Sequence, residues 1–266
     1  AFVGSDIVSG AYAADICADG SKGNILFIDI GTNGEMILKS GSKLTATSCA
    51  VGPALEGMNI SCGMRADIGA IDNFSIDKDG IRYTTIGNEK DVGICGSGVL
   101  AMLRELLKNE VISKRGAIIK KEKLDPDDYR LKFISVDEEE KAFINIGEGL
   151  YFSAKDIRQV QLAKGAILSG IICLTQKAGL RLCDIDRVYI AKYISQDSLF
   201  GVGLLPIEFL GKVEYLGNTS LSGAYLSLLD EGAIVSMNEI SRKVEFFELS
   251  RFEGYERIFT KALMFG

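Results

Sequence analysis

The stretch NILFIDIGTNGEMIL, residues 24–38, decides the fold of this chain. Its apolar run at 24–30 is rich in Ile and Leu, which is typical of a strand that is buried on both faces. The run carries one acid, Asp29, and leads through Gly-Thr-Asn-Gly to a second acid, Glu35. A carboxylate near the end of a buried strand costs free energy unless it is paired or used. Asp29 therefore marks this turn as a candidate functional site.

The segments that follow predict a three-strand meander. Residues 35–39 and 43–48 have the character of strands and are separated by Ser-Gly-Ser at 40–42, which is a hairpin signal. A second hairpin is predicted over 71–76 and 80–86, where Asp-Lys-Asp-Gly forms the connection.

Helices and strands alternate in the rest of the chain. The longest helix is predicted from an N-cap at Ser153 to about residue 178, where Gly179 stops it. The other elements expected are a helix from Ser97, strands at 187–191 and 243–249, and helices at 218–229 and 253–264. Residues 113–147 are rich in charge and are expected to form a solvated insertion with one or two strands. This order predicts an α/β fold with a mixed sheet flanked by helices.

The composition is that of a folded chain with a sizeable core. The 266 residues are 47% hydrophobic and allow one large domain or two small ones. The net charge is −6 and no Lys/Arg cluster stands out, so a nucleic-acid partner has little electrostatic support. No uninterrupted apolar run reaches ~18 residues, and no membrane span is expected. The first twenty residues lack the basic start of a signal peptide, so a cytoplasmic location is expected.

Cysteine and histidine usage limits the chemistry. The six cysteines form no C-x-x-C pair, which favours reduced and mostly buried thiols. A thiol cluster of Cys49, Cys62 and Cys95 is the alternative, although their spacing fits no common metal site. The chain has no histidine, so catalysis has to use carboxylates, lysines, backbone amides or a bound metal.

The turn after the first strand has two interpretations. As a phosphate-binding turn, its glycines let the backbone approach an anion, its Thr and Asn donate to phosphate oxygens, and its acids hold Mg²⁺ or the water around it. As an ordinary hairpin, Asn-Gly forms the turn and the first acid bonds locally. The residues concerned are Asp29, Gly31, Thr32, Asn33, Gly34 and Glu35.

Three further features carry the same ambiguity. Gly96, Ser97 and Gly98 precede a predicted helix, where their amides could cradle an anion, or Ser97 could simply be the N-cap. Glu56 lies in a glycine-rich apolar stretch and is either near a nucleotide or metal or a helix-capping carboxylate. Lys164 on the longest helix either faces a cleft or is a solvated, snorkelling lysine.

The same residues carry a family resemblance. Asp-Ile-Gly-Thr after a buried strand resembles a phosphate motif of the actin-like ATPase superfamily, which includes sugar kinases and Hsp70-type chaperones. More closely, the chain resembles the C-terminal region of the reductive activators of corrinoid proteins, which are iron–sulfur ATPases. The matching segments are FVGSDIVSG (2–10), ILFIDIGTNGEMIL (25–38), CAVGPALEGMNISCGMRADIGAI (49–71), GICGSGVL (93–100), DIRQVQLAKGAILSGI (156–171), VGLLP (202–206) and GNTSLSGA (217–224).

The resemblance implies a fold and a function. Residues 1–266 would form one ribonuclease-H-like lobe of the actin-like ATPase type, while the first ATPase lobe and the 2Fe-2S domain lie outside this chain. The intact protein would bind Mg-ATP at 29–35, with Asp29 as a metal ligand and Asp29 and Glu35 as catalytic carboxylates. Hydrolysis would drive a conformational change that helps deliver an electron to a Co(II) corrinoid protein. This lobe would be inactive on its own.

One departure from the family leaves a second function open. The family usually has Ala-Gly-Gly-Phe-Gly after the strand at 187–191, whereas here Ala191 runs directly into Lys192 and Tyr193. Without those glycines the backbone has less room beside an adenosine. The chain is therefore either an ATPase lobe or a docking and dimerisation module that has lost nucleotide binding. A sugar or carboxylate kinase is a third possibility.

Overall fold

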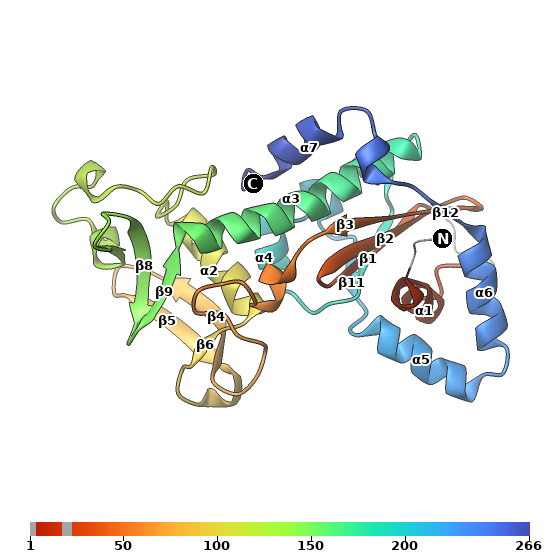
Figure 1. The fold of residues 1–266 in the computed structure, drawn as a ribbon, viewed down its shortest axis with the longest axis horizontal. Coiled ribbons are helices and arrows are strands. Elements are labelled where there is room, and N and C mark those ends of the chain that lie inside the picture. The colour runs from red at the N-terminus through yellow and green to blue at the C-terminus, as the bar shows by residue number, and fades with distance from the viewer. Residues whose placement is uncertain (1–3, 18–22) are drawn as a thin grey trace. The chain divides into compact units, whose positions relative to one another are not determined.

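The structure is a computed structural model that describes residues 4–17 and 23–266. The first two residues of the FVGSDIVSG segment lie outside these ranges. The chain divides into two compact units, each made of separate stretches of the chain, and Figure 1 labels their helices and strands. Unit 1 contains Ala1–Ala50, Ala166–Tyr193 and Leu205–Thr260, and unit 2 contains Val51–Gly165, Ile194–Leu204 and Lys261–Gly266.

Unit 1 is built on a mixed sheet with the strand order β11-β10-β1-β2-β3-β12. The strands are β1 (Ile25–Ile30), β2 (Asn33–Ser40), β3 (Lys43–Ala50), β10 (Arg187–Ile190), β11 (Val213–Tyr215) and β12 (Val244–Phe246). The predicted antiparallel meander is present as β1, β2 and β3. β10 joins the other side of β1 as a parallel strand, and β11 continues in parallel to β10.

Helices cover both faces of this sheet, which explains why β1 is almost wholly apolar. On one face, α1 (Ser5–Ala13) lies so close that a Cβ on Gly10 would come within 2.8 Å of the Phe27 ring. On the other face, a Cβ on Gly170 of α3 (Ala154–Lys177) would come within 3.3 Å of the Met36 sulfur. Because successive side chains of a strand alternate between faces, both faces of β1 need apolar residues, and only Asp29 departs from this pattern.

Unit 1 contains three further helices in the C-terminal part of the chain. They are α5 (Thr219–Leu229), α6 (Ala233–Lys243) and the greater part of α7 (Tyr255–Ala262). α1 and α6 were not predicted. The strand predicted at 243–249 is wrong in its extent: Lys243 ends α6, and β12 covers three residues, Val244–Phe246.

Unit 2 contains two three-stranded sheets. The first, in the order β5-β4-β6, combines β4 (Ala70–Ile76), β5 (Ile81–Thr85) and β6 (Gly93–Ile94), and it confirms the predicted second hairpin. The second contains β7 (Ile134–Val136), β8 (Ala142–Gly147) and β9 (Leu150–Ser153). β7 and β8 are the strands expected between 113 and 147. The helices are α2 (Gly96–Lys108), α4 (Gln196–Gly201) and the first half of α3.

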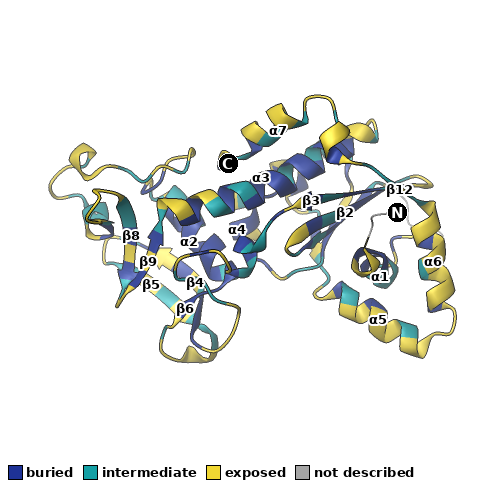
Figure 2. Cartoon of the chain, in the orientation of Figure 1, coloured by how far each residue is buried: buried dark blue, intermediate teal, exposed yellow. Residues whose placement is uncertain are grey.

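The start and end of α3 follow the predicted signals. Ser153 directly precedes the helix and exchanges hydrogen bonds with Asp156: its N–H donates to a carboxylate oxygen at 2.8 Å, and its Oγ accepts from the Asp156 N–H at 3.3 Å. Gly179 follows the helix with φ +74°, in the left-handed region that favours glycine. α3 is long and apolar enough to cross a membrane by length and composition alone, yet the greater part of its most apolar stretch is buried inside the structure (Figure 2).

Candidate functional site

The β1–β2 turn brings the two predicted acids together. Asp29 and Glu35 are direct cross-strand partners, and the next pair toward the turn is Ile30 with Gly34. The N–H of Gly31 donates to the carbonyl oxygen of Asn33 at 3.0 Å and closes the turn. Cross-strand partners project to the same face of a sheet, so both carboxylates lie on the face that α1 covers.

A third carboxylate, which sequence analysis missed, joins this pair from α1. Asp6 lines a pocket of about 400 Å³ together with Asp29 and Glu35. The other lining residues are Gly4, Ser5, Gly31, Thr32 and Asn33. Two contacts hold the acids in place: the Gly4 N–H donates to Glu35 Oε1 at 3.3 Å, and the Ser5 hydroxyl donates to Asp6 Oδ1 at 3.4 Å. Thr32 and Asn33 are exposed at the tip of the turn.

Burial and mutual repulsion raise the pKa values of the two strand acids. The pKa of Asp29 is raised mainly by desolvation and then by the charge of Asp6. The pKa of Glu35 is raised mainly by desolvation; the Gly4 N–H opposes the rise, and the charges of Asp29 and Asp6 add to it. The site therefore favours a proton or another cation close to these carboxylates.

A second pocket of about 400 Å³ shares Asp29 with the first. Beside Ile30 of β1, its walls come from the segment after β10 and from the start of α5: Ala191, Lys192, Tyr193, Gly217, Asn218, Thr219 and Ser220. The Ser220 hydroxyl donates to Asp29 Oδ2 at 3.5 Å, and both this bond and the charge of Lys192 lower the pKa of Asp29. Asn218 caps α5 by accepting the N–H of Leu221 at 3.0 Å. Asp29 thus lies at the junction of two pockets, one acidic and one that contains a lysine.

The carboxylates of the site suit a cation that also binds water or phosphate oxygens. Within residues 4–17 and 23–266, no three Asp, Glu or Cys side chains gather closely enough to hold a metal by themselves. Mg²⁺ commonly keeps several water or phosphate ligands and takes only one or two protein carboxylates. Asp29 as a metal ligand therefore stays a prediction that this arrangement permits.

The remaining predicted residues form a separate group in unit 2. Glu56 ends a short 3₁₀ helix (Pro53–Glu56), and α2 starts beside it: a Cβ on Gly96 would come within 2.0 Å of the Leu55 carbonyl oxygen and 3.3 Å of Glu56 Cα. A Cβ on Gly98 would likewise come within 2.1 Å of the Ile71 carbonyl oxygen. Close backbone packing is thus one sufficient reason for both glycines. A role for this group toward a nucleotide stays a prediction.

Two local interpretations of unit 2 are corrected. Ser97 is not the N-cap of α2, because the helix already begins at Gly96 with Cys95 as its cap. The Ser97 hydroxyl instead lies 3.2 Å from the Cys95 thiol. Lys164 is neither solvated nor snorkelling: it is 1% exposed, and its ammonium group donates to the carbonyl oxygens of Ala262, at 2.8 Å, and of Met264.

The cysteines behave as separate thiols. Cys49 and Cys95 are buried and donate to the carbonyl oxygens of Gly34 and Ile71, at 3.3 and 3.2 Å. Burial raises the pKa of Cys49 to about 12. Cys49, Cys95 and Cys173 are thus small core residues, whereas Cys62 is partly exposed and Cys17 and Cys183 are exposed.

Known proteins match almost the whole chain. A family model described as the C-terminal domain of RACo, the ASKHA domain, matches residues 23–266. The corrinoid activation enzyme RamQ of Eubacterium limosum is 34% identical over 253 residues, which cover 91% of this chain and 42% of that protein. The Co(II) methylated amine-specific corrinoid protein reductase of Methanosarcina barkeri is 27% identical and is covered over 41% of its length.

A solved structure agrees with these relatives. The reductive activator for corrinoid, iron–sulfur protein superposes with a TM-score of 0.88 at 34% identity, over 99% of this chain and 42% of that one. The chain therefore spans about two fifths of the length of the relatives that it matches. The expected actin-like fold is confirmed, and the chain belongs to the RACo C-terminal family of ASKHA domains found in reductive activators of corrinoid proteins.

Proposed function

We propose that this chain is the C-terminal ATPase lobe of a corrinoid-protein reductive activator and that Mg-ATP binds at its β1–β2 turn. The observation that carries the proposal is the cross-strand pairing of Asp29 with Glu35 beside the exposed Thr32 and Asn33. Within the described residues, the two desolvated acids gain only long hydrogen bonds from Gly4 and Ser220, whereas a metal-bound phosphate would use both acids and the two short hydrogen-bond donors beside them.

The charges of the pocket favour magnesium-bound phosphate over free phosphate. Asp6, Asp29 and Glu35 line one pocket, and they would repel an unneutralised anion. A divalent cation relieves the repulsion that raises the pKa values of Asp29 and Glu35, and it supplies the link to phosphate oxygens. The residues of this pocket therefore fit ATP when magnesium is bound to it, and they do not fit metal-free ATP.

Each side chain has a distinct proposed role. Asp29 would hold the magnesium ion or its water, and the Thr32 hydroxyl and Asn33 amide would donate to phosphate oxygens. Glu35, which the Gly4 N–H orients, would hold and deprotonate a water molecule. The Gly31 N–H is already bonded within the turn, so we assign it no contact with phosphate.

The names of the relatives support a partner, and the coupling is our own proposal. Two matched proteins are named for activation or reduction of corrinoid proteins, which supports a corrinoid protein as the partner. We propose that nucleotide binding changes the conformation of this lobe and that the intact protein thereby promotes electron delivery from an iron–sulfur domain to Co(II).

Calorimetric titration with Mg-ATP and Mg-ADP tests the proposal. We expect saturable binding that is lost in Asp29→Asn and weakened in Glu35→Gln. Glu138→Gln, a change of an exposed acid in unit 2, serves as the control and leaves binding unchanged. A parallel variant carries Gly-Gly-Phe-Gly after Ala191. Binding only in that variant would show that the altered segment after β10 disables the site, and equal binding by Asp29→Asn would reject the assignment of the turn.

A second candidate function rests on an exposed apolar surface of unit 1, the α5–α6 face. α5 packs onto α1 through small residues, since a Cβ on Gly223 would come within 2.2 Å of the Ser9 carbonyl oxygen. Most of α5 and α6 is coloured as exposed in Figure 2, and the exposed residues of both helices include large apolar ones. The members of the face are Leu221, Tyr225, Leu226, Leu228, Leu229, Ile234 and Val235.

The size of this face suits a second copy of the chain. With ~60–120 Å² for each Val, Leu or Ile side chain and ~150 Å² or more for Tyr225, the exposed shares sum to roughly 300–500 Å². An apolar area of this size can form the centre of an interface to which each partner contributes ~800 Å². For the docking alternative we therefore propose a homodimer that forms through the α5–α6 face.

Sedimentation velocity over a concentration series tests this alternative. We expect a dimer that dissociates in Leu221→Ser/Leu228→Ser. Ile207→Ser/Leu210→Ser, a matched pair of exposed apolar residues elsewhere in unit 1, should leave the dimer unchanged. A monomer at every concentration rejects the homodimer. Mg-ATP binding by the unmodified chain rejects the idea that the module has lost its nucleotide site.

A further inference from the structure

Unit 2 contains a pocket that the proposed function does not use. It has a volume of about 620 Å³ and lies between the end of α2 and the segment that follows it. It shares no residue with the β1–β2 turn. Its apolar walls are aliphatic and come from Leu107, Ile112, Ala117, Ile118 and Ile119. Small-molecule sites have volumes of ~300–1,000 Å³ and mostly apolar walls, so the pocket has the size and lining of a ligand site.

The walls are held by backbone hydrogen bonds, which makes the pocket preformed. Ile112 and Ile118 form an antiparallel bridge, and the Ser113 N–H donates to the Ala117 carbonyl oxygen at 2.8 Å. Gly116 turns the chain between them with φ +80°. The buried side chain of Gln161 on α3 holds this loop in place, since its Nε2 donates to the Arg115 carbonyl oxygen at 3.1 Å. A ligand would therefore meet a fixed surface and lose little binding free energy to ordering.

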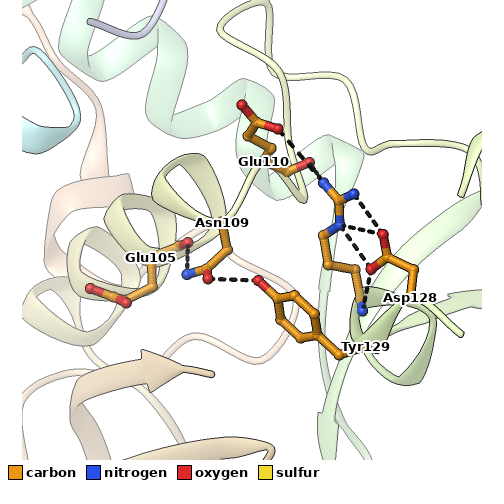
Figure 3. Close-up of polar contacts among 6 residues, drawn as sticks. Glu105, Asn109, Glu110, Asp128 and Tyr129 are labelled. Atoms are coloured by element: carbon orange, nitrogen blue, oxygen red, sulfur yellow. Dashed lines mark hydrogen bonds and ion pairs between the residues drawn. The ribbon is translucent and has the colours of Figure 1, made fainter. Parts of the chain in front are cut away.

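The one acid in the lining already has a cationic neighbour. Glu110 lies 3.8 Å from the guanidinium group of Arg130, which also donates to the Glu110 carbonyl oxygen at 3.4 Å (Figure 3). Asp128 holds Arg130 in place with an ion pair of 2.7 Å. The Tyr129 hydroxyl, which donates to Asn109 Oδ1 at 2.9 Å, ties the same segment to the end of α2. The negative charge of Glu110 is thus turned toward Arg130.

The lysines of the lining are not paired in this way. Lys114, Lys120 and Lys123 line the pocket, and none of their ammonium groups has an ion pair or side-chain hydrogen bond with any residue in the described part of the chain. Three unpaired cations beside an aliphatic cavity are complementary to a molecule with an apolar body and an anionic head. We propose that this pocket binds a small amphipathic anion with an aliphatic body.

Decanoate tests this assignment directly, because it combines a flexible aliphatic chain with one carboxylate. By calorimetry on the whole chain we expect saturable binding of decanoate that weakens as salt is added. Decan-1-ol should bind at least several-fold more weakly, and decyltrimethylammonium should not bind. Displacement of 8-anilinonaphthalene-1-sulfonate, followed by fluorescence, gives an independent readout.

Matched variants assign the binding to these lysines. Lys114→Gln/Lys120→Gln/Lys123→Gln should weaken decanoate binding about tenfold. Lys78→Gln/Lys121→Gln/Lys155→Gln removes the same charge from exposed lysines of unit 2 outside the lining and should change it little. Circular dichroism establishes that both variants are folded. Equal weakening by both triple variants, unchanged binding after loss of the lining lysines, or binding of an acidic peptide that decanoate does not displace would each overturn the proposal.

Discussion

Asp29 and Glu35 face each other across β1 and β2, one on each side of the turn that joins the strands. Their pairing places two acids in direct repulsion on a half-buried surface, where desolvation already disfavours their charged forms. Like charges directly opposite each other destabilise a sheet. The pair therefore lowers the stability of the sheet, as is expected of residues that are kept for function.

The first prediction concerns the stability of this pair. The raised pKa values mean that the folded chain keeps these protons after the unfolded chain has lost them, as pH rises above the ordinary values of 3.8 and 4.5. The free energy of unfolding therefore falls with rising pH across that window. At pH 7, Asp29→Asn should raise Tm by roughly 1–4 °C while it abolishes Mg-ATP binding.

Thermal unfolding at pH 4 and pH 7 checks this prediction. The gain in Tm from Asp29→Asn should be smaller at pH 4 than at pH 7, because a larger share of the native carboxyl is protonated at the lower pH. The control Asp67→Asn changes an exposed acid in unit 2 and should give no comparable gain. A loss of stability in Asp29→Asn at pH 7 would mean that Lys192 and Ser220 outweigh desolvation.

The second prediction concerns Lys164, whose pKa burial lowers to about 8. The unfolded chain keeps this proton up to about pH 10.5, while the folded chain releases it near 8. The unfolded state thus binds more protons in this window, and the free energy of unfolding rises with pH, by on the order of 2 kcal/mol from this group. Lys164→Met should remove that contribution.

Urea unfolding at pH 7.5, 9 and 10 measures the effect as the difference between the native chain and Lys164→Met. Tyrosines and other lysines also titrate there, and the difference cancels their shared contribution. Lys155→Met on the exposed side of α3 is the control. Parallel pH profiles for native and Lys164→Met chains would contradict the buried-lysine assignment.

The third prediction concerns the packing role of Gly96 at the start of α2. Gly96→Ala would place a methyl group 2.0 Å from the Leu55 carbonyl oxygen, and backbone atoms cannot yield as a flexible side chain can. The free energy of unfolding should fall by about 3 kcal/mol. Gly232→Ala, whose Cβ meets nothing nearer than an Asp230 carboxylate oxygen at 3.2 Å, should cost less than about 1 kcal/mol in urea unfolding.

The sequence predicts the local part of the site and misses its tertiary part. The meander and the positions of Asp29 and Glu35 follow from apolar patterning and from a short turn, both of which act within fifteen residues. Asp6 and Ser220 reach Asp29 only through the packing of α1 and α5, which no local signal specifies. Lys164 was misassigned for the same reason, since a lysine on a helix is ordinarily solvated and its carbonyl partners lie almost a hundred residues away.

The last prediction concerns Asp156, a buried carboxylate that satisfies two segments of unit 2 at once. One of its oxygens accepts the N–H and the hydroxyl of Ser61, at 2.8 and 3.0 Å, and the other accepts those of Ser153, at 2.8 and 2.6 Å. Asp156→Ala leaves four donors without their acceptor and should lower the free energy of unfolding by about 3 kcal/mol or more. Ser153→Ala removes one hydroxyl and should cost about 1 kcal/mol.

Urea unfolding of Asp156→Ala, Asp156→Asn and Ser153→Ala resolves these contributions. Asp156→Asn keeps the shape and one acceptor oxygen, so its loss should lie between those of the other two variants. Decanoate binding should survive in Asp156→Asn, because Asp156 does not line that pocket. If Asp156→Ala were no less stable than Ser153→Ala, the four hydrogen bonds would not hold the start of α3, and the position of this helix would depend on apolar packing alone.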